Sequence, residues 1–150
     1  MSYTSILIHI VWSTKNRKKI SDKYKKDIIC EHIKEYAIKN NIHILNINGC
    51  MNHLHCLIYL MPSQNIANVV QLLKGESSHW INNNFKFFGK FDWQDEYFAV
   101  SVSESMKNVM FNYINKQEEH HLKKTFEQAY KEFIDKYKFD NHLNDKFEKI

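Results

Sequence analysis

Residues 43–61 read HILNINGCMNHLHCLIYLM and decide the expected fold. Residues 43–49 alternate apolar and polar side chains, which is typical of a half-buried β-strand. Residues 53–61 form a second apolar run, and Pro62 follows at its end. The short segment between the two runs contains Gly49, so we expect a β-hairpin that turns at residues 49–52.

Residues on both sides of the hairpin complete a longer pattern. Residues 5–12 (SILIHIVW) and 97–103 (YFAVSVS) are apolar and rich in β-branched side chains, as strands are. Apolar residues at helical spacing predict one helix from an N-cap at Ser21 to Asn40, and another over residues 66–84. The order β-α-β-β-α-β predicts an α+β, ferredoxin-like fold, an antiparallel four-stranded sheet with two helices on one face.

Two more helices are expected after the last strand. The first runs from about Glu104 to about Glu118, and the second from Thr125 toward Tyr137, where Thr125 begins a capping-box pattern. We find no repeat or linker, so we expect a single domain over residues 1–150, with a polar, loosely held tail from about residue 140.

The composition narrows the class of protein. The chain has 150 residues, 43% of them hydrophobic, and its 10 Phe, 8 Tyr and 3 Trp argue against disorder. We see no apolar run long enough for a bilayer and no signal-peptide pattern. The three cysteines lack CxxC spacing, so we expect reduced thiols in a cytoplasmic protein. A net charge of +4 permits a nucleic-acid partner but does not establish one.

His53-Leu54-His55 in the second hairpin strand is the first candidate site. Residues i and i+2 of a strand point to the same face, so both imidazoles would project side by side while Leu54 enters the core. Two imidazoles on one rigid strand are metal ligands already in position. A half-buried structural role remains the alternative for each histidine, because so short a motif has many false matches.

Tyr113 and Gln117 form the second candidate, because a spacing of four places both on one face of a helix. A phenol is a poor nucleophile at neutral pH unless a metal ion and a polarised phosphate lower the barrier. The amide oxygen of Gln117 could be a third ligand of that metal. A core aromatic is the alternative for Tyr113.

Basic and aromatic side chains form the third candidate, a nucleic-acid surface. Basic loops beside exposed rings suit a single strand, whose phosphates contact lysine while its bases stack on aromatics. Solvated lysines and core aromatics are the alternative. The basic candidates are Lys15, Arg17, Lys18, Lys19 and Lys74, and the aromatic stretch is residues 80–93.

Taken together, these motifs resemble those of the insertion-sequence-200-like single-tyrosine HUH transposases (His, hydrophobic residue, His), including the REP-associated tyrosine transposases. The resemblance extends from about His9 to about Tyr130. It rests on HIVWSTKNRKK, NGCMNHLHCLI, LLKGESSHWI, FDWQDEYFAVSVSES and YINKQEEHHLKKTF. Met51-Asn52 stands where family members often carry Pro-Asp, and Lys116 stands where they often carry Asn.

The resemblance implies a DNA transposase. His53 and His55 would bind a divalent ion, Mg²⁺ or Mn²⁺, with Gln117 as the third protein ligand. Tyr113 would attack a phosphate of single-stranded DNA and form a 5′-phosphotyrosine, which a 3′-hydroxyl later resolves. Ligand softness alone would indicate zinc for an imidazole pair. The implied partners are single-stranded DNA with hairpin ends and a second copy of the chain. No nucleotide cofactor is expected, because the exchange retains the bond energy.

Two other functions remain open. Ferredoxin-like sheets also serve as non-catalytic nucleic-acid-binding modules, although this sequence lacks an RNP1-like run. A metal-dependent phosphodiesterase could use water instead, with Tyr113 in a structural role. Only the transposase would form a covalent DNA–protein adduct.

Overall fold

The computed structural model describes residues 2–20, 22–86 and 89–117, together with Gln128, Lys131 and Asp135. The strands are β1 (Leu7–Ser13), β2 (His43–Gly49), β3 (His53–Tyr59) and β4 (Phe98–Val102). The helices are α1 (Lys23–Lys39), α2 (Ile66–Asn84) and α3 (Lys107–Asn115), with 3-10 turns η1 (Lys15–Arg17) and η2 (Glu104–Met106).

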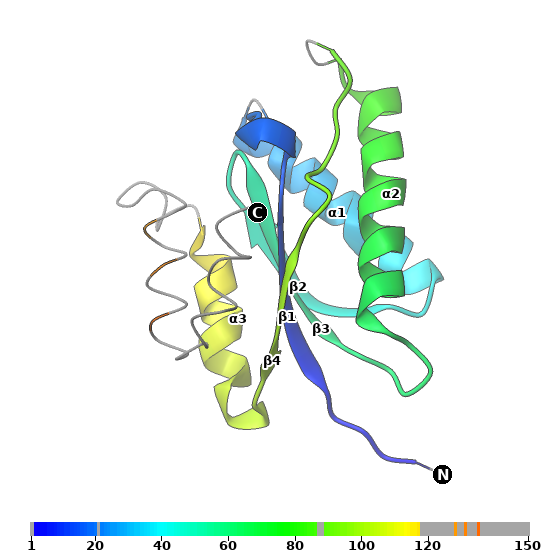
Figure 1. The fold of residues 1–150 in the computed structure, drawn as a ribbon, viewed down its shortest axis with the longest axis vertical. Helices are drawn as coiled ribbons and strands as arrows, with labels where there is room; N and C mark the ends of the chain where they lie inside the picture. Colours follow the sequence, from blue (N-terminus) through cyan, green and yellow to red (C-terminus); the bar gives the residue numbers. More distant parts are fainter. Residues whose placement is uncertain are drawn as a thin grey trace.

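The four strands form one antiparallel sheet in the order β2-β3-β1-β4. Helices α1 and α2 cover one face of this sheet, and α3 covers the other (Figure 1). The ferredoxin-like arrangement with two helices on one face is therefore confirmed. The hairpin strand β2 has the predicted bounds, whereas β3 ends at Tyr59, two residues before the predicted end.

Side-chain caps set the starts of the two long helices. Asp22, rather than the expected Ser21, is the N-cap of α1, and its carboxylate accepts a hydrogen bond from the Lys25 amide at 2.8 Å. Asn65 caps α2 in the same way, with 2.8 Å to the Asn68 amide. Each cap satisfies one of the amides that have no partner within the helix.

Apolar side chains lie on both faces of the sheet, which explains why its central strands read as nearly continuous apolar runs. The core beneath α1 and α2 includes Ile8, Ile10, Trp12, Leu54, Ile33 and Leu73. The core beneath α3 includes Leu7, Val11, Leu57, Phe98, Met110 and Ile114. The three cysteines are buried and free, as expected for reduced thiols.

The late chain differs from its prediction in part. Helix α3 begins at Lys107 because η2 occupies the first expected turn, and it ends at Asn115. The helix expected from Thr125 and the tail from residue 140 lie outside the described residues, apart from Gln128, Lys131 and Asp135. None of the helices in the described part of the chain is long and apolar enough to span a membrane.

Candidate active site

The alternation of β3 separates the histidine pair from the residue between them. Leu54 is fully buried in the core beneath α1 and α2. His53 and His55 lie on the α3 face, where their ring centroids are 5.1 Å apart. Their backbones pair with Ser13 and Val11 of β1. The sheet therefore holds both imidazoles on one rigid surface, as the i, i+2 spacing predicts.

Helix α3 brings the tyrosine to this surface within the same chain. The ring centroid of Tyr113 lies 5.7 Å from that of His55, with the ring planes at 79°. Gln117 follows one turn later, and its Nε2 donates a hydrogen bond to the Tyr113 carbonyl at 3.3 Å. Three side chains singled out in the sequence, those of His53, His55 and Tyr113, thus lie together between the sheet and α3, and the buried Gln117 follows on the same segment.

The candidate ligands are shielded from solvent. His53 and Gln117 are each 1% exposed and His55 is 5% exposed. The described residues contain no group of three or more His, Cys, Asp or Glu able to hold a metal ion. The candidate set instead offers two imidazole nitrogens and one amide oxygen. Such a mixed nitrogen and oxygen set is compatible with Mg²⁺ or Mn²⁺.

The structure adds His9 of β1 to the cluster, a residue to which the sequence assigned no role. Its ring is fully buried and stacks on His55, with centroids 5.1 Å apart and planes at 19°. His9 Nε2 lies 2.9 Å from His55 Nδ1. Burial lowers the pKa of His9 to about 3, so the ring is neutral at neutral pH. In the sequence, the only indication of a role for His9 was a histidine inside the apolar run of residues 5–12.

The turn between β2 and β3 provides partners for His53. His53 Nδ1 lies 2.8 Å from Asn52 Oδ1 and 3.1 Å from Cys50 Sγ. Burial raises the pKa of the Cys50 thiol, so sulfur remains protonated at neutral pH. The Thr14 amide in turn donates to the Asn52 carbonyl at 2.8 Å, which ties this turn to the end of β1.

Two asparagines of β2 hold the end of α3. Asn46 Nδ2 donates to the Phe111 carbonyl at 3.1 Å, and Asn48 Nδ2 donates to the Ile114 carbonyl at 3.1 Å. The buried Lys26 ammonium donates to Asn48 Oδ1 at 2.6 Å. The last four carbonyls of a helix lack partners within it, and Asn48 supplies one to Ile114. The end of α3 next to Tyr113 is thereby fixed to the sheet.

A family model described as "Transposase IS200 like" matches residues 2–117. The chain belongs to the IS200-like transposase family. Membership places this transposase among the proteins of DNA transposition and mobile elements. Its sequence is 25% identical over 114 residues to the ISDra2 transposase TnpA of Deinococcus radiodurans, across 73% of this chain and 81% of that protein. It is 24% identical over 114 residues to the IS200 transposase of Salmonella typhimurium, across 73% and 74% of the two chains.

Solved structures share the fold of the transposase. A transposase crystal structure from Deinococcus radiodurans aligns with a TM-score of 0.63 at 24% identity, over 78% of this chain and 95% of that chain. A REP-associated tyrosine transposase bound to a REP hairpin aligns with a TM-score of 0.60 at 14% identity, over 81% and 72%. At these identities the two structures establish a common fold.

The predicted DNA contacts of the transposase fall into two separate places. Lys15 and Arg17 lie in η1 and lead into Lys18 and Lys19, directly after β1 and beside Asn52. Lys74 lies on α2, across the sheet from the histidines, and its ammonium donates to the carbonyls of Gln94 and Asp95 at 2.5 and 2.9 Å. Only the loop of residues 15–19 is brought toward the candidate site.

The aromatic stretch is largely structural in the described residues. Phe91 and Trp93 are buried in the core beneath α1 and α2, and Trp80 stacks on His32 with centroids 4.1 Å apart. Phe87 and Phe88 lie outside the described residues.

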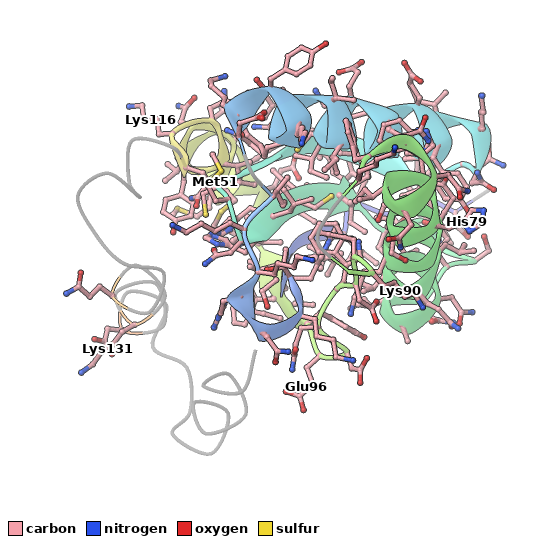
Figure 2. All side chains as sticks on the ribbon, turned by 90° about the horizontal axis from the view of Figure 1, so that it is seen from above. Met51, His79, Lys90, Glu96, Lys116 and Lys131 are labelled. Atoms are coloured by element: carbon pink, nitrogen blue, oxygen red, sulfur yellow. The ribbon has the colours of Figure 1, made fainter. Side chains whose placement is uncertain are left out.

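In Figure 2, Met51 of the hairpin turn and Lys116 after α3 lie on one side of the molecule, away from His79 of α2.

Proposed function

We propose that this transposase cleaves and rejoins single-stranded DNA, with Tyr113 as nucleophile and with a divalent ion held by His53, His55 and Gln117. The observation that carries the proposal is the 5.7 Å separation between the ring centroids of Tyr113 and His55 within one chain. This proximity supports the assignment of Tyr113 as nucleophile and of the two histidines as metal ligands, with a phosphate bound between them.

The reaction exchanges one phosphodiester for another. The Tyr113 oxygen attacks phosphorus, the bond from phosphorus to the 3′-oxygen breaks, and the phenol proton ends on that oxygen. The products are a 5′-phosphotyrosine and a 3′-hydroxyl, and attack by a 3′-hydroxyl on the phosphotyrosine reverses the exchange. Because the number of phosphate ester bonds is unchanged, no nucleotide is consumed.

The donor atoms fit Mg²⁺ or Mn²⁺. His53 and His55 would bind through ring nitrogens and Gln117 through its amide oxygen. The nitrogen of the same Gln117 amide donates a hydrogen bond to the Tyr113 carbonyl. When bound, the ion would polarise the phosphate and offset charge that develops during attack. The residues of the chain hold the donors in place and exclude bulk water, since all three are buried.

Single-stranded DNA with hairpin ends is the proposed substrate, and a second copy of the chain is the proposed partner. A relative of the same fold is bound to a REP hairpin. The basic loop of residues 15–19 lies next to the turn between β2 and β3, where the Thr14 amide contacts the Asn52 carbonyl. We therefore assign this loop to contacts with DNA phosphates.

The test is covalent capture of DNA. Labelled single strands from the sequences that flank the gene are incubated with the chain and Mg²⁺ or Mn²⁺, then separated on a denaturing gel. We expect an adduct that disappears with Tyr113→Phe or with a chelator. Tyr24→Phe is the matched control, because Tyr24 is 73% exposed on α1 and its variant should retain the adduct.

The other outcomes identify the two other functions. Cleavage that persists in Tyr113→Phe without any adduct would indicate a hydrolase that uses water. Retarded migration of DNA in a native gel, with no cleavage under any metal condition, would indicate a binding module.

A further inference from the structure

We propose that His9 and Asn52 are positioning residues that set the tautomers of His55 and His53, so that both rings present the Nε2 lone pair to the metal ion. The inference rests on the metal site proposed above and deepens it. Neither residue touches substrate in this assignment. Each acts through the histidine with which it shares a hydrogen bond.

The proton in the hydrogen bond between His9 and His55 can belong to either His9 Nε2 or His55 Nδ1. If His9 Nε2–H donates across the 2.9 Å contact, the Nδ1 lone pair of His55 is consumed and the proton of His55 sits on Nε2. A neutral His55 in that state has no lone pair to offer a metal. If His55 Nδ1–H donates instead, the lone pair of His55 is on Nε2. Metal binding by His55 through Nε2 therefore requires His9 as the acceptor.

Asn52 acts on His53 in the same way. The amide oxygen of Asn52 lies 2.8 Å from His53 Nδ1 and 3.4 Å from Cys50 Sγ. An amide oxygen only accepts hydrogen bonds. The Cys50 thiol, 3.1 Å from His53 Nδ1, donates its own proton to the same Asn52 oxygen, so we assign the proton of His53 to Nδ1 and its lone pair to Nε2. Both histidines then have the same tautomer, although their partners come from different parts of the chain.

The sheet fixes both partners. His9 is in the central strand β1, paired with Leu57 of β3 and Val100 of β4, and its ring is fully buried. The edge of Phe98 packs against it, with centroids 6.3 Å apart. The carbonyl of Asn52 is held by the Thr14 amide. Partners of this kind typically change metal affinity by about 10–100-fold when they are removed.

The first test measures the tautomers in the unaltered, metal-free chain. Long-range ¹H–¹⁵N NMR spectra distinguish a protonated ring nitrogen from one with a lone pair. We expect Nδ1–H for both His53 and His55. A proton on Nε2 of His55 would overturn the assignment of His9. Because no substitution is involved, this measurement decides the question whether or not a variant folds.

The second test measures Mn²⁺ affinity by calorimetry. His9→Phe keeps a ring of similar size without an acceptor, and we expect affinity to fall about 10–100-fold. His9→Gln places an amide oxygen near the position of Nε2 and should recover most of that loss. His43→Phe, at an exposed histidine of β2, should bind as the unaltered chain does. Thermal unfolding of the three variants provides the measure of folding.

The results separate this inference from the metal site itself. If His9→Phe binds Mn²⁺ like the unaltered chain while His55→Ala does not bind, His9 has no positioning role and the proposed site stands. If His53→Ala and His55→Ala leave Mn²⁺ affinity unchanged, the metal site fails and this inference fails with it. Asn52→Leu should weaken binding, and Asn52→Asp, which retains an acceptor, should not.

Discussion

The ring of Tyr113 stands edge-on to the ring of His55 in the same chain, with centroids 5.7 Å apart and planes at 79°. Helix α3 reaches this position because Asn46 and Asn48 of its own sheet bind its last carbonyls. The proposed nucleophile and the histidines therefore lie close together within one chain.

This arrangement predicts a site assembled within one chain. A mixture of the His53→Ala, His55→Ala double variant with the Tyr113→Phe variant should form no covalent adduct with single-stranded DNA. Each variant lacks one half of the site, and α3 is docked on its own sheet. The unaltered chain at the same total concentration is the positive control. Adduct formation in the mixture would show that α3 exchanges between copies and that the site is shared.

Local periodicity was sufficient to predict the sheet and the orientation of the histidine pair. The period of two along residues 43–49 and the apolar run after it defined the hairpin. Because side chains alternate along a strand, the sequence also indicated that Leu54 and the two histidines lie on opposite faces. The spacing of Tyr113 and Gln117 predicted a shared helix face, but α3 ends at Asn115, and Gln117 just beyond it returns only a hydrogen bond from its side chain to the Tyr113 carbonyl.

Tertiary contacts account for what the sequence could not show. His9 lies in a strand that is buried on both faces, so periodicity did not say which face it joins. Its approach to His55 depends on the register of β1 with β3, where Val11 pairs with His55. The sequence left Phe91 and Trp93 open as stacking platforms or core aromatics, and the segment after α2 folds back and buries them in the core. The same segment provides the carbonyls that bind Lys74.

Asn48 is expected to be the most sensitive of the residues that dock α3. Asn48→Ala removes the hydrogen bonds to the carbonyls of Ile114 and Asn115 and takes a partner from the buried Lys26 ammonium. We expect the free energy of unfolding to fall by about 1–3 kcal/mol, measured by urea denaturation. Adduct formation should fall too, because the end of α3 is no longer fixed.

Asn112→Ala is the control for this prediction, because Asn112 is an exposed residue of the same helix. Its effect on stability should stay within about 0.5 kcal/mol. Equal denaturation midpoints for the two variants would mean that the Asn48 contacts do not stabilise the docked helix.

The stability of the chain depends on pH through Asp27, which accepts a hydrogen bond from Lys26, the partner of Asn48. Burial acts to raise the pKa of Asp27, but hydrogen bonds from Lys23 and Lys26 outweigh it and hold the pKa below the ordinary value of 3.8. The unfolded chain therefore binds a proton more readily than the folded chain. The stabilisation is complete at pH values above the ordinary pKa and is lost as pH falls through the lower, folded value.

The measurement compares Asp27→Asn with the unaltered chain by urea denaturation at pH 7, 5 and 3. We expect the variant to be less stable at pH 7 and 5, and the difference to shrink at pH 3. Glu35→Gln on the same helix controls for the loss of one carboxylate. If the difference in stability between the two chains instead grew as the pH fell, the ionised carboxylate of Asp27 would not stabilise the folded chain.

Two glycines test whether the β2–β3 hairpin sets the position of His53. A Cβ at Gly49 would lie 2.1 Å from the His53 carbonyl oxygen and 2.9 Å from the Leu54 Cα, so Gly49→Ala must displace the backbone that carries the histidine pair. We expect a loss of about 1–3 kcal/mol in stability, by urea denaturation, and weaker Mn²⁺ binding. At Gly75, exposed within α2, a Cβ meets no atom within 4 Å. Gly75→Ala should instead stabilise the chain by about 0.5–1 kcal/mol, because alanine favours a helix more than glycine does. If Gly49→Ala retained the stability and Mn²⁺ affinity of the unaltered chain, the close approach of the two strands would not be what positions His53.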